Sequence, residues 1–358
     1  MSTLKNYYAG VYSSKGYVSL HQELADAAAL TFLVEGKSRE AKSAFIRKAA
    51  LKLMEEGLSL EYFHSPLNTR YLEGLAIPEK NVVIFDADRI SSDINSRSLT
   101  INPQISYDEG QLAETKAQAL EWEREEQQAL DNLVSAFRRA HLLHIEKEKI
   151  YLSEMDFDRA DDVTGRLLDD LFVNAVPGKE ASEGRTIFFG ASTPDGPINF
   201  IDNITEGLDK RIIIKGRPGS GKSTMMKKIA EKAAGLGLRV DRYPCSFDPG
   251  SLDMIAIPAI AAAVFDGTSP HKKEPFRPGD VVVDMFKECI SSSVEMRYKE
   301  KLDELDFLYQ KYINEGIGHL KEAGRRAALR DERIRDAASA SFDTSQFSQQ
   351  IQEMLNKL

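Results

Sequence analysis

The stretch RIIIKGRPGSGKST, residues 211–224, indicates how this part of the chain folds. It opens with a run of β-branched residues, which is typical of a buried strand. A glycine-rich loop (216–221) follows, and the segment from Lys222 to about Gly235 has the composition of a helix with glycine at its end. The order strand, loop, helix favours an α/β fold.

Residues 216–224 fit the pattern G-x-x-x-x-G-K-[ST], in which backbone amides surround a phosphate group. We call them the second loop, because a related first loop lies earlier in the chain. Glycine is needed where φ is positive or where phosphate oxygens come close, and the following helix directs its positive end at the anion. Lys222 is expected to reach the β- and γ-phosphates, and Ser223 to bind Mg²⁺. The predicted nucleotide-binding residues are Gly216, Arg217, Pro218, Gly219, Ser220, Gly221, Lys222, Ser223 and Thr224.

An internal repeat matches Lys42 with Lys222, 180 residues later, and it extends in both directions without a gap. Identical residues at this spacing include the pairs Gly10/Gly190, Gly16/Gly196, Gly36/Gly216, Ser43/Ser223, Ile77/Ile257 and Phe85/Phe265. Matched glycines at the ends of matched apolar runs are typical of a duplication. The repeat predicts two modules, residues 1–175 and 176–358, with the joint near Pro177 and Gly178.

Both halves predict the same elements: a short paired segment, a β-branched strand, a loop, a helix and further strands. Continuous apolar runs favour a mostly parallel sheet that is buried on both faces and flanked by helices. The charged segments 109–150 and 284–338 contain no proline and predict long helices after each module, with breaks or bends at Gly316, Gly318 and Gly324. The expected fold is therefore α/β, with tandem duplicated modules that are each followed by long α-helices.

Three consecutive segments carry a family resemblance: KGRPGSGKSTMMKKIA (215–230), YPCSFDPGSLDMIAIP (243–258) and VFDGTSPH (264–271). They resemble P-loop NTPases and, more narrowly, a family of bacterial predicted ATPases built from two consecutive P-loop modules. The resemblance covers nearly the whole chain. It implies nucleotide binding, and it implies no particular biological process because the family has no settled activity.

The first loop, residues 36–43, departs from this pattern. Arg39 stands where the second loop has Gly219, and Ala41 stands where it has Gly221. The Arg39 side chain would project into the phosphate position, and Ala41 adds a Cβ where bare backbone is needed. Two interpretations remain open. The first module is a structural or regulatory pseudo-ATPase, or it binds a nucleotide weakly or another anion, with Arg39 as a cationic contact.

Polar residues that differ between the halves are further candidates for the site: Asp248, Asp253, Thr268 and His271. Asp266 ends an apolar run as a Walker B aspartate does, so Ser223 and Asp266 are the predicted Mg²⁺ ligands, although a turn at Asp266-Gly267 is the alternative. Its match Asp86 survives in the first half, which a purely catalytic role does not predict. Asp248 and Asp253 follow the next apolar run, and either could orient the attacking water.

Other polar residues fit ordinary structural roles. Cys245 has no neighbouring base and is expected to be a buried thiol. Arg217 and Arg277 could contact a γ-phosphate or a second substrate, although solvated surface arginines are more common. Three histidines lack the spacing of metal ligands and are expected to lie on polar faces of helices: His141, His144 and His319.

Composition limits the partners and the location. The 358 residues carry a net charge of −9, which argues against nucleic acid as a partner. No apolar run is long enough to span a bilayer, and the N-terminus lacks the apolar segment of a signal peptide. Two cysteines fit a reducing cytoplasm.

The sequence thus predicts a cytoplasmic protein that binds Mg-ATP at its second module and hydrolyses it. Lys222 would stabilise charge on the transferring phosphoryl group, and Asp253 or Asp248 would orient water. One alternative is a kinase that acts on a small molecule or a nucleotide. Another is a nucleotide-sensing switch with little turnover, whose long helices report the bound state to an unidentified protein partner.

Overall fold

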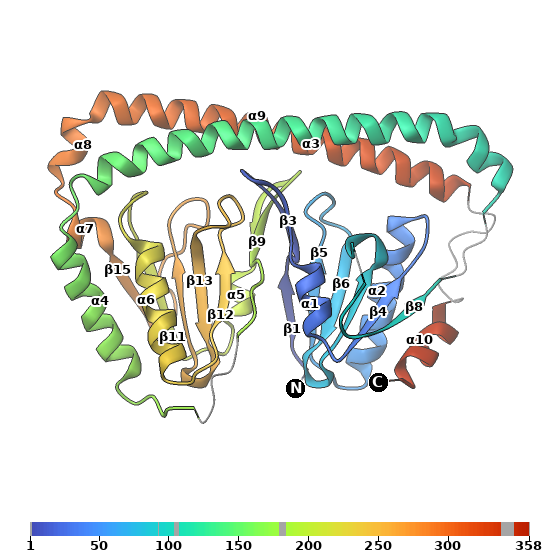
Figure 1. Cartoon of the computed structure of the whole chain (residues 1–358), viewed down its shortest axis with the longest axis horizontal. Helices are drawn as coiled ribbons and strands as arrows, with labels where there is room; N and C mark the ends of the chain where they lie inside the picture. The colour runs from blue at the N-terminus through green and yellow to red at the C-terminus, as the bar shows by residue number, and fades with distance from the viewer. Residues whose placement is uncertain (1, 92, 104–106, 179–183, 338–346, 358) are drawn as a thin grey trace.

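Two α/β modules lie side by side beneath a pair of long antiparallel helices in the computed structural model of the chain (Figure 1). The long helices are α3 (Glu109–Leu152) and α9 (Lys299–Asp336). Among the described residues, no helix is long and apolar enough to cross a membrane. The structure describes residues 2–91, 93–103, 107–178, 184–337 and 347–357.

The first module contains a six-stranded sheet in the order β1-β5-β6-β7-β4-β8 and a separate two-stranded hairpin, β2–β3. The elements of the first half before α3 are β1 (Leu4–Tyr7), β2 (Gly10–Ser13), β3 (Gly16–Ser19), α1 (His21–Ala27), β4 (Leu30–Val34), α2 (Arg39–Glu55), β5 (Leu60–His64), β6 (Leu72–Ile77), η1 (Pro78–Lys80), β7 (Val82–Asp86), η2 (Ala87–Arg89) and β8 (Arg97–Ile101). Helix α4 (Phe157–Phe172) follows α3.

The second module contains a five-stranded sheet in the order β12-β13-β14-β11-β15 and the hairpin β9–β10. Its elements before α9 are β9 (Gly190–Thr193), β10 (Gly196–Asn199), α5 (Ile201–Ile204), β11 (Lys210–Lys215), α6 (Lys222–Gly235), β12 (Asp241–Pro244), β13 (Leu252–Ile257), η3 (Pro258–Ile260), β14 (Ala262–Asp266), β15 (Asp280–Asp284), α7 (Met285–Cys289) and α8 (Ser293–Arg297). Helix α10 (Phe347–Leu355) lies after α9 in the chain.

Corresponding elements of the two halves have matching bounds. Strands β2, β3, β6 and β7 coincide with β9, β10, β13 and β14 after a shift of 180 residues. The order β5-β6-β7-β4-β8 is the same as the order β12-β13-β14-β11-β15. Even the left-handed residue after the 3₁₀ turn recurs, as Asn81 with φ 52° and Ala261 with φ 47°. The α/β class is confirmed, and the two halves share one arrangement of strands.

The sheets are mixed, because one strand in each, β6 or β13, runs opposite to the others, which all run in one direction. Strand β11 pairs in parallel with β14 and β15, whereas β13 pairs antiparallel with β12 and β14. Only η3 and Ala261 connect β13 to β14, and this connection is too short for a parallel crossover. Strand β13 is nevertheless buried on both faces, since Ile255 contributes to the core beneath α6 and Met254 to the core between the modules.

One apolar core joins the two modules and contains inward-facing residues of both sheets. Equivalent residues of the two halves contribute to it, as in the pairs Phe63/Tyr243, Ala76/Ala256 and Phe85/Phe265. Nearby, Tyr8 and its equivalent Phe188 exchange both backbone hydrogen bonds, at 2.9 and 3.2 Å. A residue that pairs with its own equivalent marks an isologous interface, so a pseudo-twofold axis runs between the halves.

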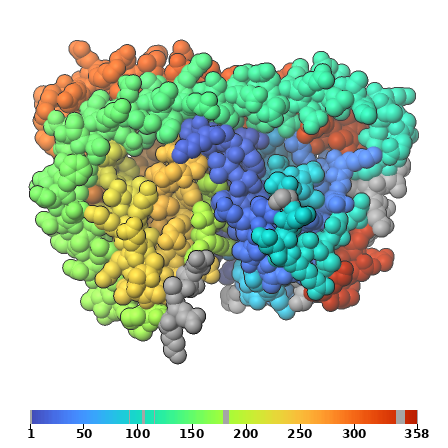
Figure 2. Space-filling view, viewed as in Figure 1, coloured from blue at the N-terminus to red at the C-terminus, as the bar shows by residue number. Residues whose placement is uncertain are grey.

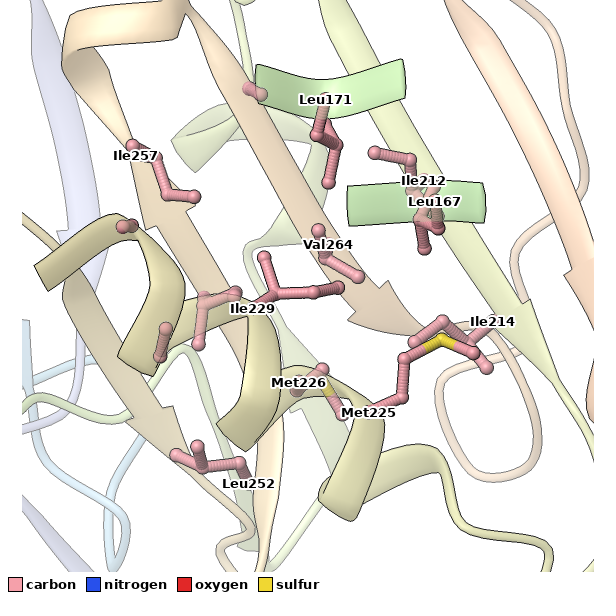
Figure 3. Packing of buried hydrophobic residues seen from close by; sticks show 14 of the residues in the cluster. Leu167, Leu171, Ile212, Ile214, Met225, Met226, Ile229, Leu252, Ile257 and Val264 are labelled. Carbon is pink, nitrogen blue, oxygen red and sulfur yellow. The ribbon is translucent and has the colours of Figure 1, made fainter. Parts of the chain in front are cut away.

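The helical extension of each half packs on the module of the other half. Helix α4 of the first half places Leu167 and Leu171 against Ile212 and α6 of the second module (Figure 3). Helix α10 of the second half contributes Phe347 to the core of the first module, with its ring centroid 5.4 Å from that of Phe45. The two halves are therefore interlocked in space, although they are consecutive along the sequence.

Helix α9 runs without interruption through its three glycines, so the predicted break does not occur. Gly316 instead allows α3 to approach, because a Cβ at this position would lie 2.5 Å from the Phe137 ring. A Cβ at Gly318 would have no atom within 4 Å. The glycines thus serve different purposes, and only one of these two marks a close helix contact.

Gly316→Ala is expected to lower the free energy of unfolding by about 1–3 kcal/mol, because the added methyl group overpacks the α3–α9 contact. Gly318→Ala should instead raise it by up to about 1 kcal/mol, since alanine is the better helix former. Urea denaturation followed by circular dichroism measures both. Equal effects of the two substitutions would contradict the close contact at Gly316.

Candidate functional site

The candidate site lies at one edge of the second sheet. Strands β11, β12, β14 and β15 run in the same direction and end at this edge, where β13 begins. Ligands bind at such carboxyl ends in open α/β sheets. The second loop follows β11, Asp248 lies in the loop after β12, Asp253 lies near the start of β13, and Asp266 ends β14. The topology therefore brings the predicted site residues to one edge.

The second loop has backbone geometry suited to an anion. Gly219 and Gly221 have φ values of 73° and 82°, which side-chain-bearing residues rarely adopt. Within the described part of the chain, the backbone amides of Gly219, Gly221, Lys222 and Ser223 donate no hydrogen bond. Successive free amides before and at a helix N-terminus can surround a phosphate or another oxyanion.

Lys222 and Asp266 face each other across this loop. The Lys222 Nζ donates to the carbonyl oxygens of Gly216 and Arg217 at 3.2 and 3.0 Å and lies 3.6 Å from Asp266 Oδ2. Asp266 Oδ1 accepts hydrogen bonds from the Thr268 amide and hydroxyl, at 2.8 and 2.5 Å. Thr268, a candidate from the comparison of the halves, therefore orients Asp266 and leaves Oδ2 towards the lysine.

Ser223 has a structural contact that also occurs in the first half. Its hydroxyl oxygen accepts a hydrogen bond from the Leu252 amide at 3.0 Å, and Ser43 accepts one from Leu72 at 2.8 Å. This bond ties the helix to the next strand and explains why the serine persists in the first loop. The described residues include no cluster of three or more His, Cys, Asp or Glu side chains that could hold a metal. A cation here would depend on Ser223, Asp266 and oxygens of its ligand.

Asp253, in strand β13, and His271, in the loop after β14, form a pair. His271 Nε2 lies 3.2 Å from Asp253 Oδ2, and the imidazole ring packs edge-on against Phe189 with centroids 4.8 Å apart. Burial and the nearby charge of Asp253 raise the pKa of the Cys245 thiol well above its ordinary value. Cys245, which was expected to be buried and is of intermediate exposure, is therefore a neutral thiol. The polar pair beside it has the donor and acceptor atoms to hold a water molecule.

Asp248 is held by residues from the first half. Lys15 Nζ lies 2.9 Å from its Oδ1, and His141 Nε2 lies 3.6 Å from its Oδ2. Burial acts to raise the pKa of this carboxyl group, but the hydrogen bonds from Lys15 and the Gly250 amide outweigh burial and keep the pKa below its usual value. Asp248 is thus an anion in a fixed position.

The C-terminal end of α3 covers the second loop, which the sequence did not indicate. A Cβ on Gly219 would lie 2.6 Å from the carbonyl oxygen of Glu148. His144 Nε2 lies 3.5 Å from Glu148 Oε1, and its ring centroid is 6.0 Å from that of Tyr309. A hydrogen bond from His144 lowers the pKa of Glu148.

The two candidate arginines do not reach the centre of the site. Arg217 extends to Glu295, with Nε 2.7 Å from Oε1, and its guanidinium lies over the Phe286 ring. Arg277 precedes β15, at the opposite edge of the sheet, and donates to the Thr205 carbonyl oxygen at 2.9 Å. Arg217 is half exposed, whereas Arg277 is part-buried and bonded to backbone, so it is not the solvated surface arginine given as the more common outcome.

The first loop has a different backbone. Helix α2 begins at Arg39, three residues before the position equivalent to the start of α6 at Lys222. Ser38 caps it, since its hydroxyl accepts the Ala41 amide and its carbonyl accepts the Lys42 amide, both at 3.1 Å. Amides that are free in the second loop are therefore occupied in the first.

The charged groups of the first loop are paired within the protein. Lys42 is 1% exposed, and its Nζ donates to the carboxylates of Asp86 and Asp88. Asp86 thus persists as the counterion of a buried lysine. Arg39 points towards the long helices, with Nε 3.2 Å from Asp331 and a terminal nitrogen 3.4 Å from Glu126. Neither Lys42 nor Arg39 is free to meet a ligand in this arrangement.

Comparisons with protein-family models, curated proteins and solved structures found no match for the chain. The resemblance to P-loop NTPases therefore depends on the residues of the second loop and on their geometry.

Proposed function

We propose that the second module binds Mg-ATP at residues 216–224 and hydrolyses it there, and that the first module is a pseudo-ATPase. The contrast between the two loops is the observation that supports this most directly. Lys222 is 13% exposed beside a series of free amides, whereas Lys42 is 1% exposed between two carboxylates. Only the second loop offers cationic and amide groups to an outside anion.

The proposed roles follow from the contacts. Lys222 and the loop amides would stabilise negative charge on the phosphates. The Ser223 hydroxyl and the Asp266 Oδ2 are oxygen donors of the kind that Mg²⁺ binds, and Oδ2 accepts no hydrogen bond from Thr268. When bound, the ion would neutralise charge between the β- and γ-phosphates. Asp253, beside His271, or Asp248, fixed by Lys15, would orient the water.

A second candidate, the nucleotide-sensing switch, is favoured by one contact. Helix α3 touches the second loop at Gly219, and the pair of long helices reaches Arg39 of the first module through Glu126 and Asp331. A ligand that displaces the second loop would therefore displace α3, and the pair of long helices extends to the other module. The kinase alternative stays a prediction that no contact favours.

Lys222→Ala is the test of the proposed site. We expect one ATP per wild-type chain in isothermal titration with Mg²⁺, and an affinity about 100-fold weaker in the variant because a phosphate charge loses its cation. Lys228→Ala is the matched control. It lies on the same helix, bonds to Asp161 at the surface, and should bind ATP like the wild type.

Unchanged affinity in Lys222→Ala would contradict the proposal. Phosphate release without an added acceptor separates the two candidate functions, since ATP binding without release is the result expected of the switch. Release that depends on a small-molecule extract would instead indicate a kinase.

A further inference from the structure

The hairpin β2–β3 of the first half reaches the site of the second module. The Ser14 amide donates to the Phe247 carbonyl oxygen at 3.0 Å, and Lys15 Nζ lies 2.9 Å from Asp248. In the space-filling view, the blue N-terminal segment lies between the long helices and the yellow and orange surface of the second module (Figure 2). The Lys15 side chain is 55% exposed, and such a surface ion pair adds little to stability. Folding alone does not require a lysine here.

The equivalent hairpin β9–β10 makes the reciprocal contact with the opposite charge. Asp195 stands at the position of Lys15 and accepts a hydrogen bond from the Thr69 hydroxyl at 2.8 Å. The module with the free amides thus receives a lysine from the other half, at its loop after β12, whereas the module with the buried Lys42 receives an acid. An acid at position 15 would repel Asp248, whose equivalent in the first half is the neutral Asn68, so the difference in charge follows the acid that only the second module presents.

Asp248 connects Lys15 to the second loop. The negative charge of Asp248 acts to raise the pKa of Glu148, and the positive charge of Lys222 acts to lower it. The loop that carries Asp248 is also joined to α6, because Lys227 Nζ donates to the Gly250 carbonyl oxygen at 3.5 Å. Without Lys15, repulsion from Glu148 would act on Asp248 with only His141 and the Gly250 amide, among its described contacts, to oppose it.

We infer that Lys15 is a positioning residue for ATP hydrolysis at the second module, where it holds Asp248 in the orientation that directs the attacking water. The inference rests on the proposed function and selects Asp248 over Asp253 for that role. It also gives the first half a task besides support, because its hairpin completes a site in the other half.

Steady-state phosphate release by the full chain tests this inference. Lys15→Ala is expected to lower kcat about 10-fold and to leave KM for ATP within about twofold, since the loss falls on the reaction and not on ATP binding. Lys15→Arg should recover most of kcat, because a guanidinium also bonds a carboxylate. Asp195→Ala removes the reciprocal contact and should change neither constant. Lys15→Ala combined with Asp248→Asn should be no slower than Asp248→Asn alone.

An unchanged kcat in Lys15→Ala, a change in KM alone, or an equal loss in Asp195→Ala would overturn the inference. Wild-type protein that binds ATP without releasing phosphate would also overturn it, while the nucleotide site would stand. Failure of the proposed function is recognised separately, as absent ATP binding or as Lys222→Ala that behaves like the wild type.

Discussion

Replacing Gly219 with alanine is expected to abolish ATP binding and to loosen the contact between the second loop and α3. The residue has φ 73°, and a side chain in this left-handed conformation costs about 1–2 kcal/mol. The new Cβ would also lie 2.6 Å from the Glu148 carbonyl oxygen, which is backbone and cannot rotate away. We expect affinity for ATP to fall at least about 100-fold and the free energy of unfolding to fall by about 1–3 kcal/mol.

Gly235→Ala is the control for this substitution, since Gly235 ends helix α6, which follows the second loop, and a Cβ there would have no atom within 4 Å. It should bind ATP like the wild type. Titration calorimetry and urea denaturation of both variants separate the site effect from a general loss of stability. Full ATP affinity in Gly219→Ala would show that the loop conformation is not needed for binding.

The burial of strands could be predicted from the sequence, but their direction could not. Apolar runs at β13 and β14 marked buried strands because both faces of the sheet are covered, one by α6 and the other by the first module. The same pattern arises in a parallel or an antiparallel pair. What sets the direction is the short turn at η3, where Ala261 adopts φ 47°. Alanine is not among the residues that favour such a turn, so it does not predict one.

Some residues of the candidate site could also be predicted from the sequence, and others could not. Lys222 and Asp266 could be predicted because each follows a strand at a fixed spacing, and Thr268 and His271 emerged from the comparison of the two halves. Lys15 and Glu148 could not be predicted. Lys15 reaches Asp248 only through the pairing of the halves, and Glu148 reaches Gly219 only because α3 crosses to the other module. No local pattern in the sequence reports such an arrangement.

The substitutions in the first loop were recognised, but their consequence differed from the expected one. Arg39 was expected to project into the phosphate position, and the structure instead directs it to Asp331 and Glu126 on the long helices. Extension of α2 by three residues changes the direction of this side chain. A rule for glycine predicts that the loop cannot keep its shape, but not which shape replaces it.

Removing the charge of Asp280 should produce the largest loss of stability among the substitutions considered. Arg211 and Asp280 are both 1% exposed, and two hydrogen bonds of 2.7 Å join them across the neighbouring strands β11 and β15. Asp280→Asn leaves the guanidinium buried with the more exposed Asp202, at 3.0 Å, as its carboxylate partner and the Thr205 hydroxyl, at 3.3 Å, as a neutral one. Breaking one side of a buried ion pair costs about 3–5 kcal/mol. Chemical denaturation at neutral pH measures this loss.

The acid side of the stability profile provides an independent test of the same pair. Hydrogen bonds from Arg211 and from the Phe276 and Arg277 amides outweigh burial and hold the pKa of Asp280 far below its ordinary value. A depressed pKa adds stability that is present above the unfolded pKa, near about 4, and is lost as the pH falls towards the folded pKa. Wild-type protein should therefore lose more stability than Asp280→Asn below about pH 4.

Lys210→Ala is the matched control, because it removes only a surface pair with Asp170. It should cost no more than about 1 kcal/mol and keep the wild-type acid profile. Because β11 leads directly into the second loop, a parallel loss of ATP affinity in Asp280→Asn would show that the register of this strand also determines the geometry of the site.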